Sequence, residues 1–392
     1  MIAEWTWLVY MAGDNNLEGA GRVDLSEMQK VGSTPQVNVL VQFDTEEQKT
    51  MRYRVEKGRA TTLQTMRGVD CGDPKVLSDF IRWGVSKYPA RRYALVVWNH
   101  GGGWEDGDFD YNANRSPKPI RASRMQRARR TLFRTTREQV NGLPVEERAI
   151  AIDCGAQDYL DNQELRQAVE NGGQKLDLFG CDACLMNMVE IAYEMKDTAA
   201  FMVGSKQTEP AAGWPYTDIL GPLTANPAMA TADLAHLIVD RYGAWYRQNG
   251  DPGEGGATQS AIDLGKVSGL AGAVDGLAKS LVKEGAAARM PIAYARSRTL
   301  QFEIPDYIDL GDFAARLAAA IPAVKPAAND VLDALGTTVV RNALWGSAVA
   351  RAQGASIFFP QSDARLIPDY KKLRFGASNA WTSFLASYFD EA

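Results

Sequence analysis

The chain has 392 residues, 45% of them hydrophobic, so it is long enough to bury a sizeable core and is not a disordered protein. A net charge of -5 and a pI near 5.4 give no electrostatic basis for binding nucleic acid or an anionic membrane surface. Four cysteines in a chain of this length are too few for a disulfide scaffold, and we interpret them as thiols.

The chain opens with an apolar run that is too short to span a membrane and that no basic segment precedes. We expect residues 5–13 to form a buried core strand. No signal peptide is expected, which favours a cytoplasmic location, although the mature or trimmed form of an exported protein would look the same.

A strand-then-helix pattern continues through the first hundred residues. Asp14, Asn15 and Asn16 are capping candidates for a helix that ends near residue 31. Further strands are predicted at residues 37–43 and 93–98, a hairpin at 51–64 and a helix starting at residue 74.

The next segment, residues 105–148, has little periodicity. Between residues 115 and 148 it carries ten Lys or Arg against three acids, and we interpret it as an exposed loop or insertion. Strands are then predicted at residues 149–153, 176–179 and 201–204, with helices at 162–169 and directly after Cys184. This alternation predicts a mainly parallel sheet with helices on both faces.

Beyond Pro222 the composition shifts toward Ala-rich helices, predicted at residues 231–246, 267–282, 310–321 and 327–339. Two short apolar runs, at 260–264 and 355–359, are expected to return as sheet strands. We therefore divide the chain into an α/β core, residues 1–225, and a helix-rich C-terminal region, residues 226–392, that contributes strands to the core sheet.

Two predicted strand ends carry residues suited to chemistry. Cys184 follows the strand at 176–179, and His100 follows the strand at 93–98 directly before three glycines. Ligands gather where parallel strands end, so His100 is placed to supply the base that a thiol needs to attack a carbonyl. The helix expected after Cys184 would further favour the thiolate. His236 lies in an amphipathic helical pattern and is interpreted as a packed or surface residue.

Cys181 and Cys184 also form a Cys-x-x-Cys pattern. Zinc needs about four ligands, and no second Cys or His pair completes a site, so no metal-ligating residues are predicted. A dithiol oxidoreductase remains an alternative, although Asp182 between the two cysteines would raise a nearby thiol pKa by like-charge repulsion. A binding module with a degenerate site is a further alternative.

Several segments resemble the clostripain family of cysteine peptidases, peptidase family C11. In matching order they are WLVYMAGDNNLE, VVWNHGGGW, LDLFGCDACLMNMVEIAYEM, GWPYTDIL, YIDLGDF and GASIFFP. The order of His and Cys is also similar to the wider caspase-like group, clan CD. The resemblance implies a caspase-like fold, with a mainly parallel sheet sandwiched by helices, and a cysteine endopeptidase that forms an acyl-enzyme.

The resemblance assigns roles to particular residues. It implies that Cys184 is the nucleophile, that His100 is the general acid and base, and that the backbone N–H groups of Gly101 and Cys184 form the oxyanion hole. Family members often have an acid before the histidine, where this chain has Asn99.

The resemblance also implies cleavage after Arg or Lys, with peptides or proteins that carry a basic P1 residue as substrates. Asp182 matches the acid at the base of the S1 pocket, Trp214 is expected to form a wall of that pocket, and Glu209 is a weaker candidate for a second acid. Lys206 and Gln207 stand where members often have acids, so Lys206 is expected to place a positive charge near the pocket.

Two further properties follow from the resemblance alone. Self-cleavage is expected at a basic bond between the His and Cys strands, where Arg129 and Arg130 are among many candidates. Calcium dependence is also implied, and the loop offers a set of oxygen ligands in Asp106, Asp108 and Asp110, without a complete EF-hand pattern.

Overall fold

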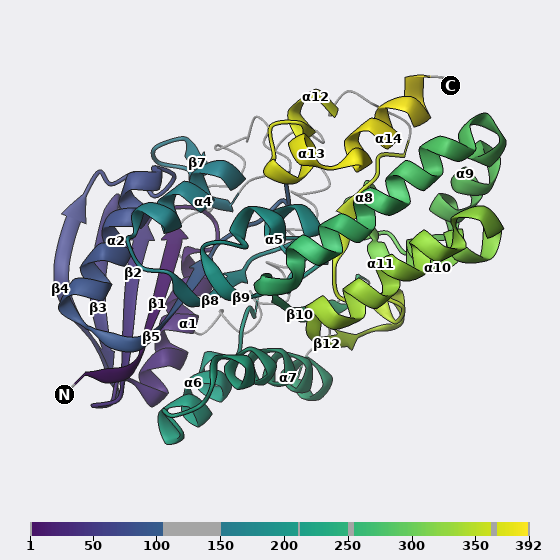
Figure 1. The fold of residues 1–392 in the computed structure, drawn as a ribbon. Helices are drawn as coiled ribbons and strands as arrows, with labels where there is room; N and C mark the ends of the chain where they lie inside the picture. Colours follow the sequence, from purple (N-terminus) through teal and green to yellow (C-terminus); the bar gives the residue numbers. More distant parts are fainter. Residues whose placement is uncertain (1, 105–149, 211, 250–254, 362–366, 391–392) are drawn as a thin grey trace.

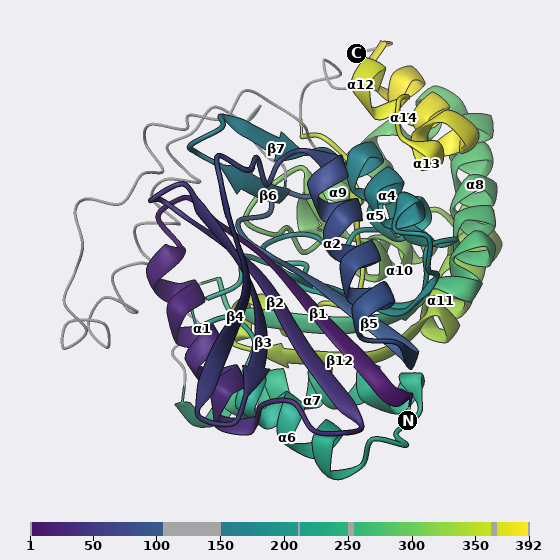
Figure 2. The same cartoon turned by 90° about the vertical axis from the view of Figure 1, so that its left-hand side faces the viewer.

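A long mixed sheet runs through the molecule in a computed structural model that describes residues 2–104, 150–210, 212–249, 255–361 and 367–390. Within these residues the sheet has nine strands in the order β12-β10-β9-β8-β5-β1-β2-β3-β4 (Figures 1 and 2). The central strands are parallel: β2 (Val37–Thr45), β1 (Ala3–Gly13), β5 (Ala90–Trp98), β8 (Leu176–Asp182) and β9 (Ala199–Gly204). The mainly parallel sheet predicted from the sequence is therefore confirmed.

Antiparallel strands extend the sheet at both ends. The hairpin of β3 (Lys49–Glu56) and β4 (Arg59–Arg67) lies beyond β2, with its turn where the sequence predicts it. At the other end, β10 (Ala257–Asp263) pairs with β9, and β12 (Val339–Trp345) pairs with β10. The sheet is thus completed by strands from the C-terminal part of the chain.

Helices cover both faces of the sheet (Figure 1). Successive side chains of β1 alternate between two core clusters, with Leu8 and Tyr10 in one and Trp7 and Val9 in the other, because a strand directs them to opposite faces. The first cluster includes residues of α2 (Pro74–Lys87), α4 (Asn162–Asn171), α5 (Val189–Met195) and α8 (Val267–Glu284). The second includes residues of α1 (Glu18–Val31), α6 (Tyr216–Ala225) and α7 (Thr231–Asn249).

The start of α2 follows its predicted signal, since the Asp73 side chain accepts a hydrogen bond from the backbone N–H of Lys75. The start of α1 does not. Its N-cap is Leu17, and no side chain caps the helix. The prediction that Asp14, Asn15 and Asn16 cap α1 is therefore wrong.

In the described residues of the C-terminal part, the four helices that the sequence predicts are α7, α8, α10 (Leu310–Ala320) and α11 (Lys325–Thr338). The sequence did not predict α9 (Arg289–Arg298) or α14 (Ala380–Asp390). The short helices α12 (Ile367–Tyr370) and α13 (Arg374–Ser378) precede α14. None of the helices in the described ranges is long and apolar enough to cross a bilayer.

Two short antiparallel pairs stand apart from the main sheet. The strand expected at residues 355–359 forms β13 (Ser356–Phe358), which pairs with β11 (Tyr307–Asp309) instead of joining the nine strands. Likewise, β6 (Ile150–Asp153) pairs with β7 (Asp158–Leu160). The segment 105–149 lies outside the described residues, and so do the positions proposed there for self-cleavage and for calcium.

Candidate active site

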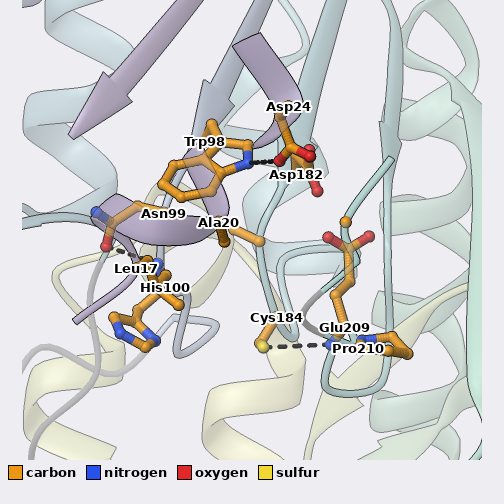
Figure 3. A pocket seen from close by; sticks show the side chains of 12 residues that line it. Leu17, Ala20, Asp24, Trp98, Asn99, His100, Asp182, Cys184, Glu209 and Pro210 are labelled. Carbon is orange, nitrogen blue, oxygen red and sulfur yellow. Dashed lines mark hydrogen bonds between the residues drawn. The ribbon is translucent and has the colours of Figure 1, made fainter. Parts of the chain in front are cut away.

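One pocket at the carboxyl ends of the central strands is lined by both His100 and Cys184 (Figure 3). The strand register explains why they meet. Trp98 of β5 pairs with Asp182 of β8. His100 is two positions after Trp98, and Cys184 is two positions after Asp182. The N–H of Asn99 also donates to the carbonyl of Asp182 at 3.3 Å, so the two strand ends stay together beyond their last paired residues.

His100 is buried, and its Nε2 lies 2.6 Å from Oδ1 of Asn16. An amide oxygen can only accept a hydrogen bond, so Nε2 carries the proton and Nδ1 keeps its lone pair. Burial lowers the pKa of His100 to about 4, which keeps the ring neutral at pH 7. Asn16, which the sequence offered only as a helix cap, therefore orients the imidazole and selects its tautomer.

We expect Asn16→Ala to lower kcat about 10–100-fold with little change in KM, because the ring loses the partner that orients it. Asn16→Asp should restore much of the rate, since a carboxylate also accepts from Nε2–H. A pH profile of kcat for the three proteins checks this. Equal losses in the two variants would contradict an orienting role.

Asn99 holds three segments together. Its side-chain oxygen accepts from the N–H of His100 at 2.6 Å and of Ile152 at 3.1 Å, while its Nδ2 donates to the carbonyl of Ala12. These bonds need a donor and an acceptor on one side chain, and a carboxylate would supply only acceptors. Asn99 thus has a structural role that joins β1, β5 and β6, at a position where the resemblance led us to expect an acid.

Cys184 is almost fully buried, and its Sγ accepts a hydrogen bond from the N–H of Glu209 at 3.2 Å. Burial raises the pKa of the thiol to about 11, with Glu303 and Asp182 as nearby acids. The thiol is therefore protonated at rest.

The prediction that a helix directly after Cys184 favours the thiolate is wrong, because α5 begins only at Val189. Leu185 has a φ of 63°, outside the helical region, and its N–H donates to the carbonyl of Gln207. The N–H of Asn187 likewise donates to the carbonyl of Ser205. The apolar spacing after Cys184 thus comes from a turn that packs into the core.

Gly101 lies against the loop that carries Cys184. A Cβ at this position would stand 2.4 Å from the carbonyl oxygen of Cys184 and 3.0 Å from Cβ of Ala183. The close approach of the two main chains therefore requires glycine.

We expect Gly101→Ala to lower kcat about 10²–10³-fold, because the added methyl group pushes apart the two main chains assigned to the oxyanion hole. Gly221→Ala is the matched control, since a Cβ there meets no atom of the described residues within 4 Å. Steady-state kinetics compares the two variants. Wild-type activity in Gly101→Ala would refute the assignment of Gly101.

The lining of the pocket includes three carboxyl groups, those of Asp24, Asp182 and Glu209 (Figure 3). Asp182 accepts from the hydroxyl of Tyr216 at 2.8 Å and from the N–H of Trp214 at 3.3 Å. Burial raises the pKa of Asp182 to about 6 and that of Glu209 well above its usual range. Asp182 accepts two hydrogen bonds, whereas Oε2 of Glu209 is buried with no hydrogen-bond partner among the described residues, so Glu209 is the acid that stays protonated and Asp182 carries the negative charge.

Asp24 and Tyr216 were not identified from the sequence. Asp24 accepts from Nε1 of Trp98 at 2.8 Å, and a Cβ on Gly213 would lie 3.4 Å from Asp24 Oδ2 and 3.1 Å from Asp182 Oδ1. A signal for Asp24 does exist, since it is one helical turn from the buried residues Ala20 and Met28 on α1. An acid on the buried, apolar face of a helix indicates a candidate binding or catalytic residue.

Trp214 is fully buried and does not line the pocket, contrary to the expectation that it forms a wall. Its ring packs on β8, where a Cβ on Gly180 would meet it at 2.8 Å. Its Nε1 donates to Glu209 at 3.3 Å. Trp214 therefore positions the acids from behind the pocket.

Lys206 is also placed differently from the expectation, because its charge faces away from the pocket. Its Nζ donates to Ser260 Oγ at 2.9 Å and to Asn342 Oδ1 at 3.0 Å, on β10 and β12. Burial lowers the pKa of Lys206 to about 7. The neighbouring Gln207 accepts from the N–H of Glu303 and so ties a distant loop to this segment.

The other sulfur and imidazole groups considered from the sequence lie away from the pocket lining. Cys181 is a free thiol in the apolar core, where burial raises its pKa well above the usual range and opposes thiolate formation. His236 is half-buried on α7. The calcium ligands suggested at Asp106, Asp108 and Asp110 lie outside the described residues, and calcium dependence stays a prediction.

A Cys and a His at neighbouring strand ends of a mainly parallel sheet, with helices on both faces, define a caspase-like α/β protein. The chain belongs to the clostripain family, whose family model matches residues 9–118 and 137–388. Clostripain of Hathewaya histolytica is 25% identical over 358 residues, which cover 78% of this chain and 61% of that protein. The chain thus spans less than two thirds of the length of this curated relative.

Solved structures share the fold. A secreted C11 cysteine protease from Bacteroides thetaiotaomicron, in complex with an irreversible peptide inhibitor, matches with a TM-score of 0.68 and 18% identity, covering 98% of this chain and 99% of the other. An inactive zymogen C11 protease from Parabacteroides distasonis matches with a TM-score of 0.70 and 20% identity, covering 96% and 97%. At these identities the likeness shows the caspase-like fold alone.

Proposed function

We propose that this chain is a cysteine endopeptidase that cleaves peptide bonds after Arg or Lys. The observation that carries the proposal is a single pocket lined by His100 and Cys184 together with Asp182 and Glu209. Such a pocket combines a nucleophile and a base with a charge that attracts a basic side chain. Membership of the clostripain family supports the same chemistry.

In this mechanism Nδ1 of His100 takes the proton of Cys184 as the thiolate attacks the scissile carbonyl. The neutral ring and the neutral thiol of the resting enzyme mean that the ion pair forms only with substrate in place. The N–H groups of Gly101 and Cys184 bind the oxyanion, and His100 then donates its new proton to the leaving amine. Water, deprotonated by His100, releases the acyl group from Cys184.

The basic P1 side chain would supply the positive charge that balances the buried carboxylates of the pocket. A guanidinium between Asp24 and Asp182 makes charge-assisted hydrogen bonds in a site with little water, where such bonds are strong. Cleavage products of a mixed peptide library test the proposal, which expects Arg or Lys on the carboxyl side of each new end.

The charge of Asp182 predicts the acid limb of the pH profile. With a pKa near 6, Asp182 is charged above that pH and neutral below it, so kcat/KM for Arg substrates should fall as the pH drops through 6. Tyr216→Phe removes a hydrogen bond that stabilises the charged form, so the limb should move to higher pH.

Tyr242→Phe is the matched control for this shift. Tyr242 is buried near the same acids, but its hydroxyl has no hydrogen-bond partner among the described residues. Its removal should leave the limb in place. An identical profile in Tyr216→Phe and in the wild-type enzyme would show that Asp182 does not set the limb.

Self-processing within residues 105–148 is part of the proposal. Support comes from β6, which follows this segment. The carbonyl of Ile152 accepts hydrogen bonds from the side chains of Asn15 and Asn99, and its N–H donates to Oδ1 of Asn99, so β6 would stay attached after a cut upstream. N-terminal sequencing of the purified protein would show a new end after Arg or Lys.

A further inference from the structure

A second cluster of reactive side chains lies at the same sheet edge, away from the pocket lining. It consists of Asp44 at the end of β2, Cys71 before α2 and Asp153 at the end of β6. A carboxylate oxygen of each acid and the sulfur of Cys71 all lie within 4.8 Å of one another, and each residue is at most 1% exposed. We call these residues the Asp44–Cys71–Asp153 cluster.

The carboxylate of Asp44 is incompletely satisfied. Oδ1 accepts from the hydroxyl of Thr50 at 2.8 Å, whereas Oδ2 is buried without a hydrogen-bond partner among the described residues. A buried carboxylate oxygen without a partner is costly, and the acids Asp14 and Asp153 nearby add repulsion. Either a proton or a cation must therefore balance the charge of Asp44.

The other two residues are oriented by main-chain hydrogen bonds. Asp153 accepts from the N–H groups of Gly155 and Ala156 through Oδ1, and from the N–H of Cys71 through Oδ2, each at 2.9 Å. The hydroxyl of Tyr10 donates to the carbonyl of Cys71 at 2.9 Å. Such outer contacts are typical of side chains that hold a metal ion.

We propose that the Asp44–Cys71–Asp153 cluster binds one divalent cation of the zinc class, with these three side chains as protein ligands and water as the fourth ligand. Thiolate and carboxylate ligands together suit Zn²⁺ and its probe Cd²⁺, whereas Ca²⁺ prefers oxygen ligands alone. The cation replaces two protons, one from the thiol of Cys71 and one from the carboxyl of Asp44. Two carboxylates and one thiolate then carry three negative charges against the two positive charges of the ion.

The cluster is connected to His100 through the segment between β1 and α1. The N–H of Cys154, next to Asp153, donates to the carbonyl of Asp14 at 2.8 Å. Two residues further on, Asn16 orients the His100 ring. A bound cation would therefore stabilise the end of β6 and the segment that positions the imidazole.

The test is Cd²⁺ binding to the full chain carrying Cys184→Ala, which removes the pocket thiol as a competing ligand. We expect one Cd²⁺ per chain, a thiolate-to-cadmium charge-transfer absorption band, displacement by Zn²⁺ and no displacement by excess Ca²⁺. In this background Cys71→Ser should abolish the band, and Asp44→Asn should weaken binding about tenfold or more. Cys181→Ala is the matched control, since it removes another fully buried thiol, and should change nothing.

Circular dichroism establishes that each variant is folded. If Cys71→Ser does not fold, Asp44→Asn decides, because it keeps the thiol and must still lose affinity. The proposal is overturned if the Cys184→Ala protein binds no Cd²⁺, if the band persists in Cys71→Ser, if Asp44→Asn binds as tightly as its parent, or if Ca²⁺ displaces Cd²⁺.

Discussion

Replacing Cys184 with alanine is expected to abolish peptide hydrolysis, with a fall in kcat of about 10⁴–10⁶-fold. The loss is large because the acyl-enzyme cannot form, and the remaining groups of the pocket supply only binding and oxyanion contacts. The fold should be unchanged, since among the described residues the sulfur accepts one hydrogen bond, from the N–H of Glu209. Fluorogenic peptides that end in Arg measure the loss, and gel electrophoresis should show a single uncut chain.

Cys181→Ala is the control for this result and also tests the dithiol alternative. Cys181 is packed in the core, so its replacement should leave the peptidase rate within a few-fold of the wild-type value. A dithiol oxidoreductase would need both sulfurs. Hydrolysis that survives in Cys184→Ala would refute the proposed nucleophile, and equal loss in both variants would favour thiol exchange.

Replacing Asp182 with asparagine should lower kcat/KM for Arg substrates about 10²–10³-fold. The estimate follows from the 3–5 kcal/mol that a buried ion pair loses when one partner is removed, at about 1.4 kcal/mol for each tenfold change. Asparagine has nearly the same shape and still accepts hydrogen bonds from Tyr216 and Trp214. The variant therefore tests the charge rather than the packing.

A substrate with a neutral P1 residue provides the control for Asp182→Asn. Its kcat/KM should change little, because the dyad is intact. Glu209→Gln should cost less than Asp182→Asn for Arg substrates, since burial raises the pKa of Glu209 well above its usual range and keeps it neutral before the substrate binds. A uniform loss for both kinds of substrate would show that Asp182 supports the fold and does not select a basic residue.

The sequence predicted the central parallel strands because they are buried on both faces and form continuous apolar runs. It did not predict β12, an edge strand at residues 339–345 that is partly exposed and follows an Ala-rich helix without a break in composition. The helix predicted after Cys184 exists as α5, but its predicted start was wrong, since α5 begins only at Val189. Apolar side chains of a buried turn can imitate helical spacing.

The sequence predicted those site residues that directly follow a strand and have a reactive side chain. His100 and Cys184 each follow an apolar run, and their meeting needs only the parallel order of β5 and β8. Asn16 and Asp24 could not be assigned in this way, because their roles depend on the position of β1 and α1 beside β5. The local sequence pattern predicts whether a residue is buried. It does not predict which side chain, distant in the sequence, a buried polar group contacts.

The most direct test of the account is mass spectrometry after reaction with a peptide chloromethyl ketone that ends in Arg. We expect one adduct, located on Cys184, formed rapidly by the wild-type protein and at most slowly by His100→Ala and by Asp182→Asn. This outcome would test in one measurement the roles of Cys184 as the nucleophile, His100 as the base and Asp182 as the acid that binds the basic P1 residue. An adduct on Cys181, or equal labelling by a reagent that ends in a neutral residue, would contradict the account.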